Sequence, residues 1–276
     1  MSNTLGTYMF LRNGDFYDYP WRESLLSVMP IAEQIVVCEC YSDKDNTWEE
    51  LQKFAAQYPK VKLVQREWIA HHSGLSQMAN YCIPFLSTDW KWQIQADEVI
   101  HENNYDVIKK ALEGAPDKVN ALKTNYTHFL GSYSKVFPFC YQNIIRIARK
   151  GSGWWLAGDA CQLDKPGYDP CEVKDTEIMV YHYGKVHSSE KGFLKEWDFQ
   201  QLYVDLGFPD PKMREMSEKL GGDYCDYLYL FESNIREGRV KDFVGTHPAV
   251  MHQRIQKFKD SGWEQFDSKM IEGLKI

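Results

Sequence analysis

The feature that most constrains the fold is an alternation of short apolar runs with amphipathic stretches over the first hundred residues. Residues 6–15, 35–40, 60–68 and 89–100 are typical of buried strands, the first of them ending in a polar loop. Residues 19–34, 47–59 and 73–86 have helical spacing between these runs, with an interruption near Pro84. A strand–helix unit repeated three times before a fourth strand predicts a parallel sheet with helices on both faces.

Polar residues follow three of the expected strands. Arg12 and Asn13 come after the first, residues 39–45 after the second, and Asp97 and Glu98 after the fourth. Ligands of such sheets bind outside the carboxyl ends of the strands. We therefore expect these three loops to line one crevice.

Beyond about residue 112 the pattern changes. Residues 119–132 and 140–163 read as antiparallel strands with glycine-rich turns, and residues 177–190 as a further strand. From about residue 190 the spacing is helical, over 191–207, 211–221 and 223–238. The expected organisation is an α/β domain at 1–189 with a helical C-terminal extension at 190–276, which serves acceptor binding or self-association.

Charge and length limit the class of protein. The chain has 276 residues and a net charge of −7, which argues against a protein that binds mainly through phosphate contacts. Residues 236–259 nevertheless carry a local basic cluster. The 9 Trp, 17 Tyr and 14 Phe fit either a thick core or stacking on sugars or bases, and the core is the simpler interpretation.

Cysteine usage and hydropathy suggest a compartment. The chain has seven cysteines with no C-x-x-C pair, which disfavours a zinc ribbon. No window approaches the eighteen or so apolar residues that span a bilayer. The first residues lack the charged start and apolar run of a signal peptide. We expect an unprocessed, soluble, reduced protein in the cytoplasm.

Four short motifs occur in a suggestive order: "FLRNGD", "YSDKDNT", "SGLSQMAN" and "WQIQADE". Together they resemble the motifs of family-2 nucleotide-sugar glycosyltransferases with the GT-A fold, over roughly residues 7–186. The last resembles the family's D-x-D element, and "YSDKDNT" resembles its "gSTDgT" stretch with one extra residue. The resemblance implies a GT-A fold and transfer of a sugar from a nucleotide-diphosphate donor.

The resemblance also implies a divalent cation, Mn²⁺ or Mg²⁺, because departure of a diphosphate leaves charge to be neutralised. Such ions prefer carboxylate oxygens. Asp97 takes the ligand position of D-x-D, with adjacent Glu98 as a possible helper or, equally, the start of a helix. His182 is expected to complete the metal or diphosphate shell, or else to be an ordinary strand histidine. Gln95 departs from the family pattern, since an amide brings no charge.

Donor-binding roles follow from the same resemblance. Glu39, at the end of the second strand, is expected to accept a hydrogen bond from the nucleobase, with Asp43 and Asp45 as alternatives. The family often has an Arg before the Asn of its helix motif, but here Ala79 precedes Asn80. The expected donor-contacting set is Arg12, Asn13, Glu39, Asp43, Asp45, Arg66, Asn80, Gln95 and Ala96, in which Arg66 or Arg12 replaces the missing Arg.

A general base is harder to find in the sequence. Inverting family members need a carboxylate that takes the proton of the acceptor hydroxyl. Asp159, in "WWLAGDACQL", is the candidate, although an acid in a turn is an equally good interpretation. His71 and His72, next to the third helical stretch, read as surface polar residues.

The leading hypothesis is a metal-assisted glycosyltransferase acting on a hydroxyl of a glycan or surface polysaccharide. One alternative keeps the chemistry and takes a hydroxylated base of DNA as acceptor, as the basic cluster suggests. Another is a nucleotide-sugar-binding module without turnover, with Gln95 as the lesion. A nucleotidyltransferase, which also uses strand-end acids, is disfavoured by "SDKDNT" and "SGLSQMAN".

Overall fold

The computed structural model describes residues 3–207 and 237–260. The first half alternates as expected. Its elements are β1 (Leu5–Leu11), α1 (Trp21–Val28), β2 (Gln34–Glu39), α2 (Thr47–Gln57), β3 (Val61–Gln65), α3 (His72–Asn80), η1 (Ile83–Phe85) and β4 (Trp90–Gln93). The strands lie in the order β3-β2-β1-β4 and all pair in parallel. The α/β fold class predicted from the sequence is confirmed.

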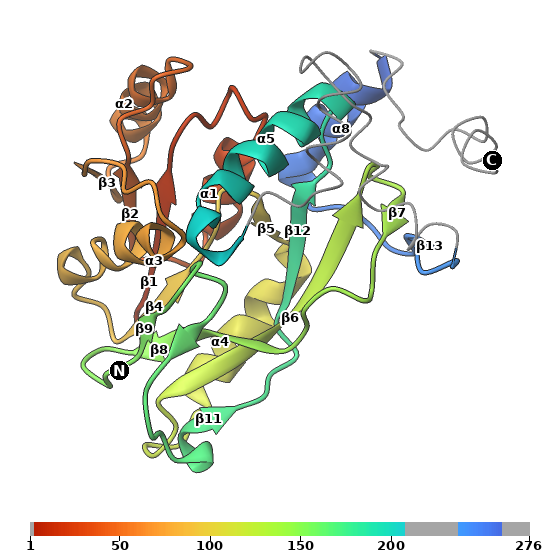
Figure 1. The fold of residues 1–276 in the computed structure, drawn as a ribbon. Coiled ribbons are helices and arrows are strands. Elements are labelled where there is room, and N and C mark those ends of the chain that lie inside the picture. The colour runs from red at the N-terminus through yellow and green to blue at the C-terminus, as the bar shows by residue number, and fades with distance from the viewer. Residues whose placement is uncertain (1–2, 208–236, 261–276) are drawn as a thin grey trace.

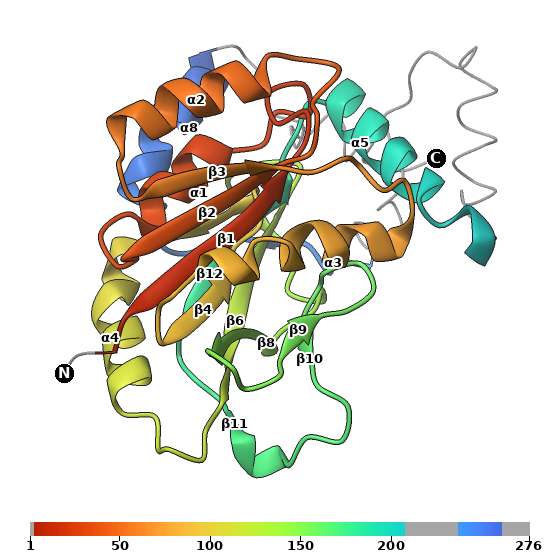
Figure 2. The ribbon, with the colours of Figure 1, turned by 90° about the vertical axis from the view of Figure 1, so that its left-hand side faces the viewer.

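The sheet is buried on both faces, which explains the continuous apolar strands. Leu5, Met9 and Leu11 of β1 point to a core that α1, α2 and α4 (Tyr105–Glu113) share. Tyr8 of β1 points to the opposite core, which α3 covers. Figure 2 shows α1 and α2 on one side of the first strands and α3 on the other. Alternate residues of one strand thus serve two helical layers.

The expected strand at 89–100 is broken in two. β4 ends at Gln93, and residues 98–100 form β5 (Glu98–Ile100), which pairs antiparallel with β12 (Met179–Lys185). The break is a turn in which the N–H of Glu98 donates to the carbonyl of Gln95, 3.1 Å away. The prediction of one continuous strand was wrong because this segment exchanges β1 for β12 as its partner. Asp97 lies at the crossover.

The second half is a mixed sheet. Its remaining elements up to residue 207 are η2 (Glu102–Asn104), β6 (Ala121–Leu130), β7 (Lys135–Val136), β8 (Ile144–Arg149), β9 (Trp155–Leu156), β10 (Leu163–Asp164), η3 (Pro170–Glu172), β11 (Val173–Lys174), α5 (Ser189–Gln201) and η4 (Val204–Leu206). β8 pairs antiparallel with β6, as the sequence predicts. It also pairs antiparallel with β4, and β12 runs parallel to β6. Figure 1 shows β6 and β12 side by side.

The described part of the C-terminal region packs on the α/β domain. It contains β13 (Lys241–Asp242), η6 (Ala249–Met251) and α8 (His252–Asp260). Met251 and Ile255 enter a small core with Val99, Phe129 and Tyr183. The expected helices at 211–221 and 223–238 lie outside the described residues, apart from the last two positions. Within the ranges 3–207 and 237–260, every helix falls short of the length and apolarity needed to cross a bilayer.

Candidate active site

Asp97 lies on the turn between β4 and β5 and is only 8% exposed. Its carbonyl accepts a hydrogen bond from the N–H of Tyr183 on β12, 2.8 Å away. Its side chain faces two basic groups: Lys195 Nζ is 3.1 Å from Oδ2, and His182 Nε2 is 3.7 Å from Oδ1. Burial alone would raise the pKa of Asp97, but the ammonium of Lys195 is the largest opposing cause, and the pKa is lowered. Asp97 is therefore a buried, ionised carboxylate.

His182 belongs to a chain of hydrogen bonds that fixes its tautomer. Nε2 of His128, on β6, donates to the carbonyl of Tyr141 at 2.8 Å. His128 Nδ1 then has a lone pair and accepts from His182 Nδ1, 3.0 Å away. Burial lowers the pKa of His128 to about 4 and that of His182 to about 3, so both rings are neutral near pH 7. This assignment leaves the Nε2 lone pair of His182 facing Asp97.

Asp97 Oδ1 and His182 Nε2 are therefore two acceptors that face each other without a proton between them. Their separation of 3.7 Å is too long for a hydrogen bond and short enough for both to bind one ion. We call these two residues the Asp97 pair. A neutral histidine whose other nitrogen is held by a hydrogen bond is the usual form of a metal ligand.

Gly184 keeps the space beside the Asp97 pair open. A Cβ at this position would lie 2.5 Å from Asp97 Oδ2 and 2.8 Å from His182 Nε2. Every other residue type would fill that space. The residues of this site fit a divalent cation through one carboxylate, one imidazole and room beside them.

Lys195 comes from α5, which lies beyond the carboxyl ends of β1 and β2 (Figure 2). Besides Asp97, its ammonium donates to the carbonyl of Gly184 at 2.6 Å and lies 4.7 Å from the ring centre of Tyr19. Sequence reasoning missed this residue, because a lysine in a helix 98 positions away carries no signal. Lys195 adds a fixed positive charge to the site.

Glu98, the residue after Asp97, has a different set of partners. It is completely buried, and Nη2 of Arg146 on β8 donates to both carboxylate oxygens, at 2.9 and 2.7 Å. Tyr126 Oη and the N–H of Gln95 also donate to it. Burial raises the pKa of Glu98, and Arg146 opposes that rise. These bonds hold the turn, and a role of Glu98 beside a metal stays a prediction.

Gln95 and Ala96 complete the turn. The backbone N–H of Gln95 donates to Glu98, and its carbonyl accepts from Ser24 Oγ at 3.0 Å. The Gln95 amide donates to the carbonyl of Ala160 at 3.4 Å. Ala96 is 8% exposed. The amide of Gln95 thus contacts the β9–β10 loop.

Arg12, Asn13 and Asp43 come together as expected from the sequence, since the loops after β1 and β2 meet. Asn13 is fully buried, and its side chain donates to Asp43 Oδ1 at 2.9 Å and accepts from the N–H groups of Asp43 and Lys44. Arg12 donates to Asp43 Oδ2 at 2.7 Å. The hydrogen bond from Asn13, followed by the charge of Arg12, lowers the pKa of Asp43. We call Arg12, Asn13 and Asp43 the first-loop network.

The other expected donor residues beside these loops also have internal partners. Glu39 is buried and accepts from the N–H of Ser42 at 2.6 Å and from Gln65 at 2.9 Å. Asp45 accepts from the N–H groups of Phe16 and Thr47. Both acids therefore shape the loop in this structure, and their roles toward a donor remain predictions.

Asn80 is the last residue of α3, and Arg66 contacts the same helix. Arg66 donates to the carbonyl of Gln77 at 2.9 Å. The Asn80 amide exchanges two hydrogen bonds with the backbone of Leu156, at 2.8 and 3.0 Å, and so joins α3 to β9.

Asp159 is exposed in the loop between β9 and β10, next to Ala160, which Gln95 contacts. Its Oδ1 accepts from the N–H of Cys161, and its Oδ2 accepts from Tyr203 Oη at 3.3 Å. Arg146 holds the same loop through the carbonyls of Ala160 and Cys161. The loop is therefore placed against the turn that carries Asp97, and the role of Asp159 as a base stays a prediction.

Among known proteins, the chain matches solved structures at low sequence identity. No protein-family model and no curated protein sequence matches it. S. aureus TarS 1-349 in complex with UDP-GlcNAc is similar with 15% identity and a TM-score of 0.39, over 46% of this chain and 36% of TarS 1-349. The structure of the same protein with UDP has 11% identity and a TM-score of 0.44, over 84% of this chain and 72% of that one. M. tuberculosis glucosyl-3-phosphoglycerate synthase, in complex with Mn²⁺, UDP and phosphoglyceric acid, has 13% identity and a TM-score of 0.43, over 76% of this chain and 80% of that one.

The fold class of the present chain follows from its own strand order, β3-β2-β1-β4 continued by β8 and β6.

Proposed function

We propose that this protein is a glycosyltransferase that moves a sugar from a nucleotide-diphosphate donor to an acceptor hydroxyl with the help of a divalent cation. The observation that carries the proposal is the Asp97 pair, two buried lone-pair atoms 3.7 Å apart at the carboxyl edge of parallel strands. Substrates of such sheets bind at that edge. The choice of a sugar–phosphate bond as the bond that is cleaved rests on the four sequence motifs.

Asp97 and His182 would hold the cation, which neutralises the departing diphosphate when it is bound. Lys195 Nζ, 3.1 Å from Asp97, adds a second positive charge next to that position. The relay through His128 keeps the proton on His182 Nδ1, so that Nε2 stays available as a ligand. Lys195, together with the cation when it is bound, would therefore place positive charge where the leaving group gains negative charge.

The acceptor side of the proposal rests on Asp159. As general base, Asp159 would take the proton of the attacking hydroxyl. Its exposure allows an acceptor to reach it, and its loop contacts Gln95 beside the Asp97 turn. A glycan or surface polysaccharide hydroxyl is the acceptor that the sequence resemblance favours.

A DNA acceptor is the less favoured variant. The basic cluster that suggested it includes Arg254, which is 14% exposed and donates to Asp18. Arg239 of the same cluster forms an ion pair with Glu237 at 2.6 Å. Two of its cations are thus engaged within the protein.

A thermal-shift screen of nucleotide sugars with Mn²⁺, with Mg²⁺ and with EDTA tests the proposal, because a ligand of the folded state raises the melting temperature. UDP and UDP-GlcNAc are the first ligands to include. We expect a shift for one donor that needs the metal, followed by transfer to a hydroxyl acceptor. A nucleotide shift that ignores metal would favour the inactive binding module. No shift with any donor would contradict the proposal.

A further inference from the structure

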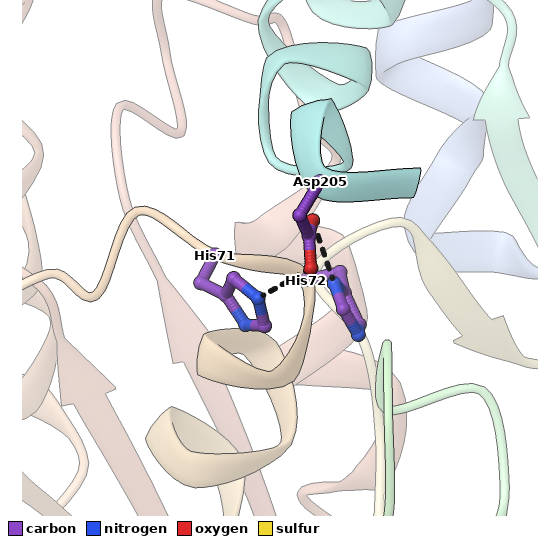
Figure 3. A group of neighbouring side chains, drawn as sticks. All are labelled: His71, His72 and Asp205. Carbon is purple, nitrogen blue, oxygen red and sulfur yellow. Dashed lines mark hydrogen bonds and ion pairs between the residues drawn. The ribbon is translucent and has the colours of Figure 1, made fainter. Parts of the chain in front are cut away.

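A second group of potential metal ligands lies away from the Asp97 pair. His71 and His72 stand at the start of α3, and Asp205 lies in η4, 134 residues beyond His71. His71 Nε2 is 3.1 Å from Asp205 Oδ2, and His72 Nδ1 is 3.7 Å from Oδ1. Figure 3 shows both imidazoles directed at the one carboxylate. The three ligand atoms all lie within 4.8 Å of one another.

The separations suit a tetrahedral ion. Zinc bonds to nitrogen and oxygen of about 2.0–2.2 Å place neighbouring tetrahedral ligands about 3.3 Å apart. The two measured imidazole–carboxylate separations, 3.1 and 3.7 Å, lie on either side of that distance. Two imidazoles with one carboxylate are a typical ligand set for Zn²⁺, whereas Mg²⁺ and Ca²⁺ prefer oxygen ligands.

His72 gives an independent indication of a missing partner. Its Nδ1 atom is buried, and within the described residues it has no hydrogen-bond partner. The ring is held in place, because it stacks on Tyr203 with 5.3 Å between ring centres and 19° between planes. The backbone N–H of His72 donates to the carbonyl of Leu202 at 2.8 Å. A fixed nitrogen directed at a carboxylate 3.7 Å away is suited to a metal bond.

The side chain of His71 caps α3: its Nδ1 accepts from the backbone N–H of Ser73 at 3.2 Å and lies 2.7 Å from Ser73 Oγ, so the proton of the neutral ring lies on Nε2, which donates to Asp205. A metal at Nε2 requires the other tautomer, in which Nδ1–H donates to Ser73 Oγ. His71 and Asp205 are 43% and 51% exposed at the side chain. The site is therefore open to solvent, so an ion could enter and a chelator could remove it.

We propose that His71, His72 and Asp205 form a zinc site that fastens the segment after α5 to the start of α3. The three side chains supply three ligands, so the fourth tetrahedral position of the ion is left for water. The site is separate from the Asp97 pair and does not depend on the proposed transferase activity. It acts on the same helix, because α5 carries Lys195, and the ion would limit the movement of that helix relative to the sheet.

Metal-stripped protein titrated with ZnCl₂ tests this site through its melting temperature and through the number of zinc ions bound. We expect a rise of roughly 5 °C at a hundredfold excess of Zn²⁺ over its Kd, and one bound ion fewer in Asp205→Asn than in the unsubstituted chain. His72→Phe keeps a ring on Tyr203 and removes the ligand nitrogen, so it should lose the same ion.

Two control variants separate this ion from others. Asp97→Asn should keep the zinc response of His71, His72 and Asp205, because only the other site is changed. Asp117→Asn removes an exposed acid elsewhere and should behave like the unsubstituted chain. Equal zinc binding and equal melting shifts in the unsubstituted chain, Asp205→Asn and His72→Phe would overturn the proposal, as would no saturable zinc binding at all.

Discussion

The first-loop network and the Asp97 pair both contain an aspartate beside a nitrogen-bearing side chain, but only the first-loop network is joined by hydrogen bonds. In the first-loop network, Asn13 and Asp43 hydrogen-bond to each other, and Arg12 neutralises the Asp43 carboxylate. In the Asp97 pair, the carboxylate and the imidazole face each other at 3.7 Å with no hydrogen bond between them. A satisfied polar network stabilises a loop, whereas two facing acceptors offer lone pairs to a cation. The proposed function therefore assigns the cation to the Asp97 pair and a structural role to the first-loop network.

α5 connects the two sides. Lys195 contacts Asp97, and one turn further Asp198 accepts from Lys44 in the loop after β2, at 2.6 Å. Tyr17 Oη donates to the same Asp198. The helix therefore contacts both the Asp97 pair and the loop after β2.

The largest effect should come from Asp97→Asn. The change keeps the shape of the side chain and removes the only negative charge of the Asp97 pair. We expect transfer activity to fall at least about a thousandfold, roughly 4 kcal/mol of transition-state stabilisation, because cation binding is lost. Steady-state kinetics with Mn²⁺ and circular dichroism of the variant would measure loss of function and retention of fold. Activity equal to that of the unsubstituted chain would end the assignment.

Arg146→Met should cost about 3–5 kcal/mol of unfolding free energy, because it leaves the buried Glu98 carboxylate without its ion-pair partner. The double variant Arg146→Met/Glu98→Gln should regain much of that loss, since the unpaired charge is then gone. Urea unfolding of the three proteins measures both effects. A cost below 1 kcal/mol in the single variant would show that Glu98 is not held as the structure indicates.

His128→Phe tests whether the relay prepares the Asp97 pair. Phenylalanine keeps the ring stacked near Tyr126 but removes the acceptor of His182 Nδ1. Loss of such a supporting bond typically weakens metal affinity 10–100-fold. The Kd of Mn²⁺ should rise by this factor. The variant His247→Phe, at a partly buried histidine outside the relay, should leave the Kd unchanged. Equal Kd values in both variants would mean that His128 only packs.

The sequence predicted the parallel half well, because a strand buried on both faces needs a continuous run of apolar residues, as at 35–40. It also placed Asp97 at the edge of the sheet. It could not predict the break after Gln93, which depends on pairing with Tyr181 and His182 some eighty residues later. Lys195, His128 and Arg146 were missed for the same reason, since each acts through a partner distant in the chain. That Glu98 is paired with Arg146, whereas Asp97 is not, likewise depends on the position of Arg146 on β8.

The smallest effect should come from Asp43→Asn in the first-loop network. The side chain of Asp43 is 58% exposed, so solvent screens its ion pair with Arg12 and the loss should be about 0.5 kcal/mol. The folded-state pKa of Asp43 is below its ordinary value of 3.8, so the carboxylate stabilises the fold above about pH 4 and this contribution disappears as the pH falls through the lower folded value. Urea unfolding from pH 7 to pH 2 should therefore show the two proteins differing near neutrality and converging in acid. Their Mn²⁺ affinities should agree at pH 7, and a large loss of metal binding in Asp43→Asn would place this loop, together with Asp97, among the groups that hold the cation.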